Sequence, residues 1–300
     1  MRYWMPVDLY VGGAEHAVLH LLYARFWTKA LADCGLVPFR EPFATLRNQG
    51  QLLAPDGTRM AKSRGNVITP DSIVASYGAD ALRVYEMFMA PFDQDIAWST
   101  EGLSGARRFL NRIWNLYRDT FADSMKSTGD DRTLIRLLHQ TIRNVEERID
   151  SFRLNTMVST LMEFTNALSE RQHAGACQTA AFHQALETLL VLLAPAVPHI
   201  AEELWQLTGH AGSVHQQAWP AWDVELARDK MVQIPIQING KLREVIEVPA
   251  DISPDDLQQA ALELPRVQQH LEGRQVVKTI YVPGKVLNLL AEKNKAMLIG

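Results

Sequence analysis

Residues 7–16 read VDLYVGGAEH, and this stretch decides the fold of the first part of the chain. Its first five residues form a short apolar run that predicts a strand, and Gly12 and Gly13 end that run. Helical character then continues over residues 14–32. A strand, a tight glycine turn and a helix form half of a βαβ unit, with the N-terminus of the helix at the carboxyl end of the strand. The chain is therefore predicted to begin as an α/β fold.

A second strand and a basic loop follow this unit. Residues 44–53 predict the strand, which contains Asn-Gln-Gly at positions 48–50. The basic loop, residues 59–63, reads RMAKS and is followed by RGN. Lysine supplies a point charge to phosphoryl oxygens, and small neighbours let the backbone close over them. A basic loop is also compatible with plain solvated charge, so this stretch by itself leaves both interpretations open.

The middle of the chain is predicted to be helical. Thr69 as N-cap and Pro70 in the first turn predict a helix up to Tyr77, and a second helix follows over 79–89. A first long helix is expected over 99–117, and four apolar stripes at helical spacing come after it. The stripes are Leu134, Leu138, Ile142, Val145 and Ile149; Met157, Leu161, Phe164 and Leu168; Leu186, Leu189, Leu190 and Leu193; and Ile200 with Leu204. Such helices with short joints predict a bundle.

The last segment changes to the period of a β-strand. Residues 233–238 alternate, Asn239 and Gly240 are a hairpin signal, and residues 241–248 alternate on the return. Two helices and a third strand are predicted next, over 254–262, 265–271 and 276–282. The predicted fold class is therefore multidomain: α/β, then an all-α bundle, then a small α+β domain.

Composition excludes several classes of protein. The chain has 300 residues, 47% of them hydrophobic and 21% charged, which is typical of a globular protein with two or three domains. No apolar run approaches 18 residues, so we expect no membrane span, and the N-terminus has no signal-peptide pattern. Cys34 and Cys177 are solitary, which favours a reducing, cytoplasmic location. A net charge of −4 argues against a globally basic nucleic-acid binder but allows a local basic face.

Several polar residues near the predicted strand ends have two interpretations. In the first interpretation Glu15 accepts hydrogen bonds from ribose hydroxyls and His16 lines the adjacent ligand pocket. In the second, Glu15 is an acid at the start of a helix, where the helix dipole favours it, and His16 is a histidine whose hydrogen bonds are made within the fold. Gln49 can reach the same crevice or bond only the sheet edge. His16 and His20 share a helix face, but without a third ligand they do not predict zinc.

A basic stripe is predicted on the first bundle helix. It consists of Arg107, Arg108, Arg112 and Arg118. A solvated helix face explains such a stripe, and so does contact with a phosphate backbone if the partner is RNA. The sequence pattern alone does not decide between these two explanations.

In this order, the motifs resemble class I aminoacyl-tRNA synthetases, and more narrowly the C-terminal portion of bacterial-type leucyl-tRNA synthetases. The resemblance rests on the strand with Gly-Gly-Ala-Glu-His, on Asn-Gln-Gly and on the basic loop. It also rests on residues 77–83, residues 107–112 and the end segment from Ile238 to Lys285. The family signature of the basic loop is Lys-Met-Ser-Lys-Ser. Here Arg59 replaces the first lysine and Ala61 the first serine, while Lys62 is retained.

The resemblance implies a domain order. Residues 1–66 would be the second half of a Rossmann-like catalytic domain, and residues 67–100 a helical connector that contacts the tRNA stem. Residues 101–226 would be an anticodon-binding-type helical bundle that binds tRNA. Residues 231–292 would be a small C-terminal α+β domain that also binds tRNA.

The resemblance also implies an activity and its residues. The reaction is ATP-dependent activation of leucine to leucyl-adenylate and transfer to tRNA(Leu), with Mg²⁺ sharing the triphosphate charge. Lys62 and Arg59 would be catalytic, and no metal site is assigned. The residues implied to bind ATP or the adenylate are Gly12, Gly13, Glu15, His16, Gln49, Met60, Lys62 and Ser63. Those implied to bind tRNA are Arg107, Arg108, Arg112, Lys241 and Lys285.

Part of the family pattern does not occur in these residues. The first strand of the nucleotide fold, the histidine-rich ATP motif and the editing domain have no counterpart here. We therefore expect the chain to need a partner polypeptide or gene segment that carries the N-terminal half. The alternatives are a non-catalytic tRNA-binding module derived from a synthetase and, against the end domain, another nucleotidyl-transferring member of the superfamily.

Overall fold

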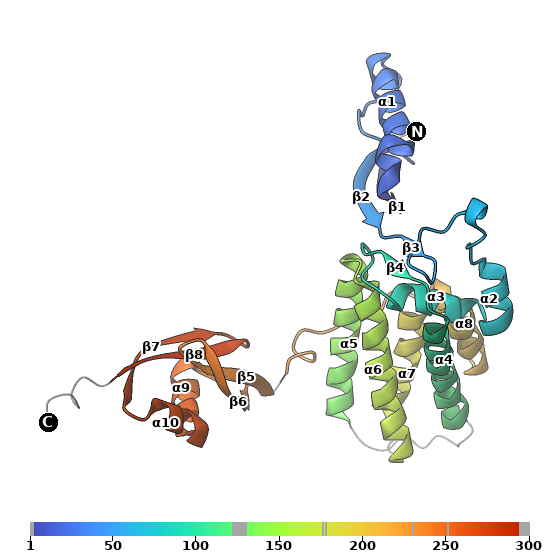
Figure 1. Ribbon diagram of the computed structural model, residues 1–300. Coiled ribbons are helices and arrows are strands. Elements are labelled where there is room, and N and C mark those ends of the chain that lie inside the picture. The colour runs from blue at the N-terminus through green and yellow to red at the C-terminus, as the bar shows by residue number, and fades with distance from the viewer. Residues whose placement is uncertain are drawn as a thin grey trace. The chain divides into compact units, whose positions relative to one another are not determined.

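The computed structural model has two compact units, Met1–Leu226 and Ala227–Gly300, and each is described by itself (Figure 1). The residues that it describes are 3–121, 131–175, 177, 179–229, 231–250 and 252–293. The first unit combines an α/β segment with a helical bundle, and the second is a small α+β domain. The predicted fold class is therefore confirmed. No helix in the described ranges is long and apolar enough to span a bilayer.

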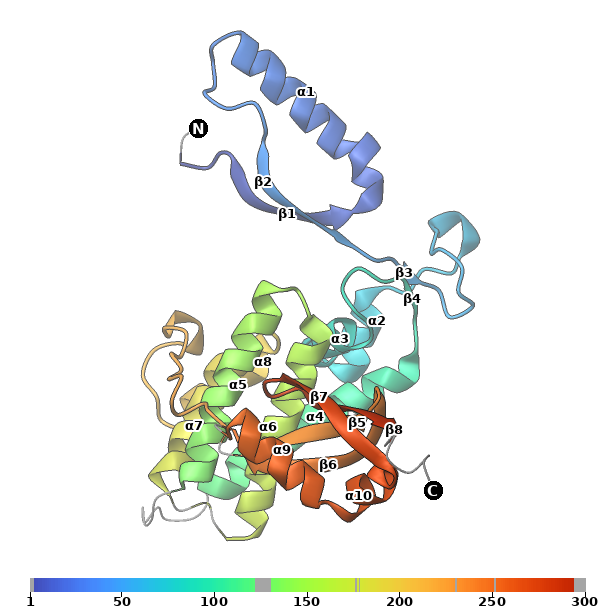
Figure 2. The same cartoon turned by 90° about the vertical axis from the view of Figure 1, so that its left-hand side faces the viewer.

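The first unit begins with the predicted βαβ segment, here named the arm. Strands β1 (Val7–Gly13) and β2 (Phe43–Gln49) pair in parallel. Helix α1 (His20–Asp33) connects them, and Figure 2 shows it running beside the two strands. Their register places Gly13 opposite Gln49, so both strands end at the same edge. The predicted strand and helix are confirmed, and the parallel pairing with β2 completes a βαβ unit.

The helix after β1 is not continuous, which corrects the prediction for residues 14–32. A 3₁₀ segment, Ala14–Val18, precedes α1, and Leu19 breaks the two apart with φ −115° and ψ −106°. The break lets His20 meet β1, because its ring stacks on that of Tyr10 at a centroid distance of 5.5 Å. The Nδ1 atom of His20 also lies 3.0 Å from the Tyr10 hydroxyl. A tertiary contact here overrides the local helical pattern.

The predicted second strand is also split in two. After β2 the chain leaves that sheet at Gly50, and the short strand β3 (Leu52–Leu53) pairs in parallel with β4 (Ile96–Ala97). The amide of Gly50 donates to the carbonyl oxygen of Phe92 at 2.9 Å. A Cβ atom at Gly50 would collide with the backbone of Gln94. Only glycine permits this close approach of two backbones.

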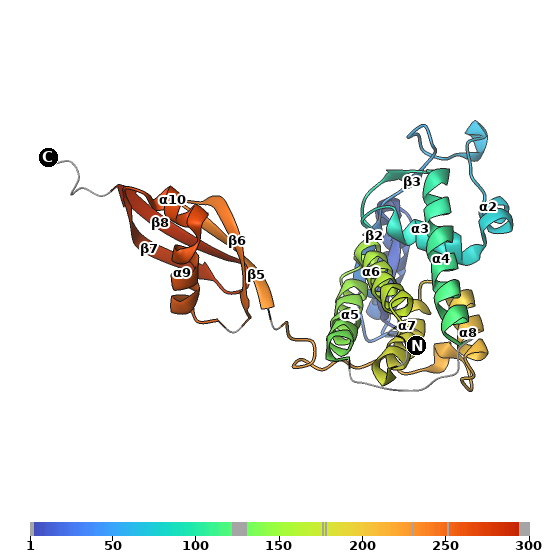
Figure 3. The ribbon, with the colours of Figure 1, turned by 90° about the horizontal axis from the view of Figure 1, so that it is seen from below.

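The connector and the bundle contain seven α-helices in the described residues. They are α2 (Pro70–Tyr77), α3 (Ala79–Phe88), α4 (Thr100–Phe121), α5 (Arg132–Asp150), α6 (Leu154–His173), α7 (Ala180–Leu193) and α8 (Pro198–Leu207). Figure 3 shows α4 to α8 grouped into the bundle. Every residue of the four predicted stripes is buried except Ile149 and Ile200, which pack against the same core. The stripes are therefore the core of the bundle, as predicted.

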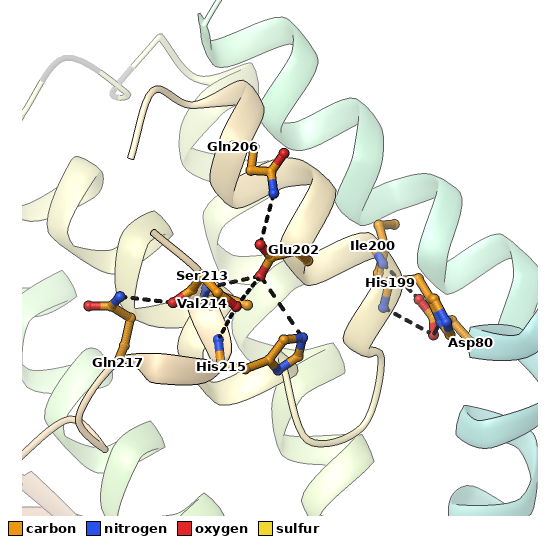
Figure 4. A network of polar contacts seen from close by, with 9 residues as sticks. All are labelled: Asp80, His199, Ile200, Glu202, Gln206, Ser213, Val214, His215 and Gln217. Atoms are coloured by element: carbon orange, nitrogen blue, oxygen red, sulfur yellow. Dashed lines mark hydrogen bonds and ion pairs between the residues drawn. The ribbon is translucent and has the colours of Figure 1, made fainter. Parts of the chain in front are cut away.

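A buried carboxylate joins α3 to the bundle (Figure 4). Asp80 is 7% exposed, and it accepts a hydrogen bond from the amide of Ile200 at 2.8 Å. Its Oδ1 atom lies 2.7 Å from Nδ1 of His199. Both partners belong to the first turn of α8, whose free amides carry the positive end of the helix dipole. Asp80 therefore caps α8 from another helix.

The guanidinium of Arg83, which is also on α3, binds the corner between α7 and α8. Arg83 donates from Nε to the carbonyl of Ala196 at 3.0 Å and from Nη2 to that of Pro195 at 2.7 Å. These carbonyls follow the end of α7, where the helix dipole is negative. The acid and the base of α3 thus match the charges of two helix ends. The loop after α8 is held in turn by Glu202, which accepts from Gln206, Ser213 Oγ and Val214 N (Figure 4).

The second unit is a four-stranded sheet in the order β6-β5-β8-β7. Its elements are β5 (Met231–Ile238), β6 (Lys241–Pro249), α9 (Pro254–Glu263), α10 (Pro265–Leu271), β7 (Arg274–Val282) and β8 (Val286–Lys293). The hairpin signal is confirmed, because Asn239 and Gly240 both have positive φ, at 50° and 77°. Strand β8 was missed. It lies inside the sheet and buries Leu287 and Leu289, but consecutive leucines blur its alternation.

We predict that Asp80→Ala lowers the free energy of unfolding of the first unit by about 1–3 kcal/mol, because the part-buried first-turn amides of α8 lose their acceptor. Urea unfolding followed by circular dichroism measures this. The matched control is Asp71→Ala, which removes an exposed acid from the first turn of α2 and should have little effect. Equal losses in the two variants would contradict the cross-helix cap.

Candidate functional site

Five of the predicted adenylate-binding residues meet at the carboxyl ends of β1 and β2. Gly12 pairs with Asn48 and Gly13 pairs with Gln49 across the two strands. Glu15 and His16 follow in the 3₁₀ segment that leaves the same edge. Ligands of parallel α/β sheets bind at such edges. The structure therefore brings Gly12, Gly13, Glu15, His16 and Gln49 together.

The two glycines leave room for neighbouring side chains at this edge. A Cβ atom at Gly13 would collide with the carboxylate of Glu15, which folds back over the glycine. A Cβ atom at Gly12 would lie 3.2 Å from the ring of Tyr10 and 3.7 Å from that of His16. Gly13 therefore lets the carboxylate of Glu15 lie directly above the end of β1.

His16 is packed among aromatic rings without a polar partner. Its ring lies edge-on to Tyr10 and to His20, with centroid distances of 6.5 Å in both cases. Its Nδ1 atom is buried, and no group in the described part of the chain forms a hydrogen bond with it. A buried ring nitrogen usually has a partner. His16 therefore does not have all its ring nitrogens hydrogen-bonded within the described residues, because Nδ1 has no partner.

The basic loop is built on a tight hairpin. The amide of Ala54 donates to the carbonyl of Thr58 at 2.8 Å, and Leu53 and Arg59 form an antiparallel bridge. A single 3₁₀ turn, Lys62–Arg64, then ends at Gly65, whose φ is +65°. Glycine accepts this left-handed conformation without strain. The loop thus has a defined backbone on both sides of Lys62.

Asn66 organises the basic loop, and the sequence analysis assigned it no role. Its Oδ1 atom accepts from the amide of Ala61 at 2.9 Å. Its Nδ2 atom donates to Thr58 Oγ1 at 3.1 Å and to the carbonyl of Arg59 at 3.3 Å. Asparagine side chains commonly mimic a backbone turn in this way. Its position directly after the glycine that closes the loop was the available signal.

Charges link the loop to the strand edge. The guanidinium of Arg59 lies 3.7 Å from the carboxylate of Glu15, with side-chain exposures of 66% and 41%. An exposed pair of this kind contributes about 0–1 kcal/mol, so it can be exchanged for a ligand at little cost. Lys62 and Ser63 are exposed, and Lys62 has no ion pair with any described residue. Met60 instead packs against the core of the bundle, which anchors the loop.

The described residues contain no group of three histidine, cysteine or acidic side chains that could hold a metal ion. Magnesium bound to nucleotide phosphates usually keeps several waters and needs one or two protein carboxylates. The hydrogen-bond donors at this edge are cations and amides, whereas Glu15 is an acceptor. The donors suit a polyphosphate rather than a protein-bound metal cage.

The predicted tRNA-binding residues lie in both units. On α4, Arg107 donates to the carbonyl of Tyr77 at 2.7 Å, and Arg112 donates to Asn166 Oδ1 of α6. Arg108 is exposed and forms no hydrogen bond or ion pair with a described residue. Lys241 begins β6 and Lys285 lies in the turn before β8, both exposed. Arg108 is thus the arginine of this set with a guanidinium available for phosphate.

Two family descriptions match the chain. Residues 2–99 match class I tRNA synthetases (I, L, M and V). Residues 131–259 match the anticodon-binding domain of tRNA ligase. The first range contains the arm, the basic loop, α2 and α3. The second contains α5 to α8 and continues into the second unit.

Curated relatives are leucine–tRNA ligases. The chain is 48% identical over 292 residues to the protein of Dehalococcoides mccartyi (strain ATCC BAA-2266 / KCTC 15142 / 195), which covers 97% of this chain and 36% of the relative. It is 46% identical over 289 residues to that of Chlorobaculum tepidum, covering 96% and 35%. The chain therefore spans about a third of the length of the curated relatives it matches.

Solved structures give the same picture. The chain is similar, with a TM-score of 0.84 and 34% identity, to a leucyl-tRNA synthetase of Agrobacterium radiobacter K84 in a ternary complex with tRNA and LeuAMS. The match covers 96% of this chain and 38% of that one. A methionyl-tRNA synthetase of Mycobacterium tuberculosis, solved with methionyl-adenylate, matches 70% of this chain and 46% of its own, with a TM-score of 0.55 and 19% identity. At that identity the likeness concerns the fold alone.

We predict that Asn66→Ala loosens the basic loop and speeds tryptic cleavage after Arg59, Lys62 and Arg64. Losing three hydrogen bonds worth about 0.5–1 kcal/mol each should raise the rate roughly ten- to 150-fold. Limited digestion followed by mass spectrometry measures cleavage at these bonds. Asn111→Ala, in the exposed part of α4, is the control and should leave them unchanged. Unaltered cleavage in Asn66→Ala would show that the amide does not hold the loop.

Proposed function

The chain belongs to the class I aminoacyl-tRNA synthetases, where it corresponds to a C-terminal portion of leucine–tRNA ligases, and we propose that it supplies part of their active site. The proposed reaction forms leucyl-adenylate from leucine and ATP and transfers leucine to tRNA(Leu). The observation that carries this proposal is the meeting of Glu15, Gln49 and the basic loop at one strand edge. The 3.7 Å distance between Arg59 of the basic loop and Glu15 supports it.

The residues at this edge divide the work on the nucleotide. Glu15 lies over Gly13 and would accept hydrogen bonds from the ribose hydroxyls, while Gln49 and His16 would line the adenylate pocket. Arg59 would exchange its weak contact with Glu15 for a phosphate oxygen. Backbone at Gly12 and Gly13 lets the nucleotide approach closely.

Lys62 would stabilise the leaving pyrophosphate. The leucine carboxylate attacks the α-phosphorus in line, and negative charge builds on the β- and γ-phosphates as the bond to the α-phosphorus breaks. The exposed ammonium of Lys62, on a loop held by Asn66, can follow these oxygens. Bound Mg²⁺ would share that charge. Arg59 supports Lys62 with a second, fork-shaped cation.

We also propose that the site is completed by a nucleotide-fold segment outside these 300 residues, in the same polypeptide or in another one. The support is the exposed apolar surface of the arm. Large side chains of α1 are more than half exposed: Leu22 at 55%, Tyr23 at 61%, Phe26 at 66% and Trp27 at 63%. An open two-stranded sheet with such a helix is typical of an interface.

The tRNA partner is proposed to bind through the bundle and the second unit. Arg108 would contact the phosphate backbone from α4, whereas Arg107 and Arg112 also hold α2 and α6 in place. Lys241 and Lys285 would contribute from the turns of the second unit. We propose the cytoplasm as the compartment, in keeping with two free cysteines, Cys34 and Cys177.

We predict that Lys62→Ala reduces leucine-dependent pyrophosphate exchange at least about 100-fold, because a positioned cation on the leaving group is lost. The assay uses the chain together with a separately expressed N-terminal half of a leucine–tRNA ligase. Arg64→Ala, on the same 3₁₀ turn, is the matched control and should retain activity.

The same assay separates the two interpretations of the chain. Exchange that requires both halves supports an active-site component. If the reconstituted pair stays inactive while the chain alone binds tRNA, the chain is a tRNA-binding module and the catalytic proposal is wrong.

We predict that Arg108→Ala weakens tRNA binding and lowers the slope of log K against log salt by about one, as expected for one lost phosphate contact. Filter binding at several salt concentrations measures the slope. Arg118→Ala is the control, because Arg118 is already paired with Asp119 at 2.8 Å on the same helix. The phosphate role of Arg108 is excluded if both variants keep the wild-type slope.

A further inference from the structure

Phe152 occupies a backbone position that normally belongs to glycine. It follows Ser151, the C-cap of α5, and has a φ of +57°. The amide of Phe152 donates to the carbonyl of Ile149 at 3.0 Å, and that of Arg153 donates to Arg148 at 2.8 Å. These two bonds define a Schellman motif, whose left-handed residue is usually glycine. A bulky residue with this φ is a strained outlier.

Other helices of the chain show what the position ordinarily holds. After α1, α6 and α8, the residue one past the C-cap is Gly35, Gly175 or Gly209, with φ between 70° and 85°. In the described residues, Phe152 and Asn239 are the non-glycine residues with positive φ, and asparagine tolerates that region. The α5–α6 turn therefore keeps a phenylalanine where its backbone favours glycine.

The ring of Phe152 reaches out of the bundle. It packs edge-on against Phe92 with a centroid distance of 5.1 Å. The guanidinium carbon of Arg47 lies 5.6 Å from the centroid of the same ring. Phe92 lies in the loop before β4, and Arg47 lies in β2 of the arm. The side chain of Phe152 thus contacts two segments outside the bundle, namely the loop before β4 and strand β2 of the arm.

Both contacts converge on the strand that carries Gln49. Arg47 precedes Gln49 by two residues on β2. The carbonyl of Phe92 accepts the amide of Gly50, directly after Gln49. Phe152 therefore meets the end of β2 through one side-chain contact and one step through the Phe92 loop.

We propose that Phe152 is a positioning residue that holds the end of β2 against the bundle and so sets the place of Gln49. The inference rests on the proposed function in one respect, the assignment of Gln49 to the adenylate pocket. Its physical basis is an aromatic pair and a cation–π contact that offset the strain of the backbone. It makes the α5–α6 turn a link from the helical bundle to the strand edge that carries Gln49.

Phe152→Gly tests the link, because glycine suits the backbone and removes only the ring. In the full chain, hydrogen exchange of residues 43–53 should accelerate about ten-fold, the factor expected for losing both ring contacts. The protection of α5 and α6 from hydrogen exchange should not decrease, and the melting temperature should not fall. Phe152→Tyr keeps the ring and should restore the wild-type exchange of β2.

Two results would overturn the link. One is unchanged exchange of residues 43–53 in Phe152→Gly, and the other is faster exchange throughout the bundle, which would make the ring a packing group only. Arg47→Ala should also accelerate hydrogen exchange of β2. The double variant should exchange only slightly faster than Phe152→Gly, since both changes remove the same contact, that of Arg47 with the ring of Phe152. Full additivity of the two accelerations would count against the link.

Activity then tests the consequence separately. In the reconstituted enzyme, Phe152→Gly should lower leucine-dependent pyrophosphate exchange several-fold with unchanged tRNA affinity. Normal pyrophosphate exchange despite a loosened β2 would refute the positioning of Gln49. An inactive wild-type pair would instead refute the proposed function, while the hydrogen-exchange result would stand by itself.

Discussion

Two side chains one turn apart on α3 hold the connector to the bundle, and the rest of the first unit depends on them. Asp80 and Arg83 meet a helix N-terminus and a helix C-terminus, so each charge is neutralised by backbone groups that would otherwise remain unpaired. A buried carboxylate is tolerable only with such partners. Because α3 is held against the bundle in this way, it also fixes one end of the segment that contains the basic loop and α2. Met60 of the basic loop packs against the core of the bundle.

The arm contrasts with this saturated bundle. The apolar stripes of the bundle are buried, whereas α1 presents Tyr23, Phe26 and Trp27 to solvent. The arm reaches the rest of the first unit through a few defined contacts: the close backbone approach at Gly50, the strand pair β3–β4, the weak pair of Arg59 with Glu15, and the ring of Phe152. The relative position of the strand edge and the basic loop, which together make up the proposed site, therefore depends on a small number of residues. A surface of this kind also gains stability when a further segment covers it.

Local patterns predicted most of the elements because their causes are local. Helical spacing of Leu134 to Ile149 requires one buried face, and Asn239-Gly240 requires a turn with two positive φ values. Predictions were wrong where a distant group decided the backbone. His20 meets Tyr10 and breaks the helix after β1, Gln94 crowds Gly50 and splits the second strand, and β8 is inserted beside β5 in the middle of the sheet. Gln94 and β8 are far away in sequence, and Tyr10 lies on another element, ten residues before His20.

The sequence by itself determined the fold class, the bundle core and the hairpin, since residue type and spacing carry them. Only the tertiary structure decided which residues meet: that Gly13 faces Gln49, that Glu15 lies beside Arg59, that Asn66 closes the basic loop, and that Phe152 touches β2. The physical reason is that such contacts join groups far apart along the chain. Their geometry follows from how helices and strands pack, and packing is a property of the whole unit rather than of any stretch within it.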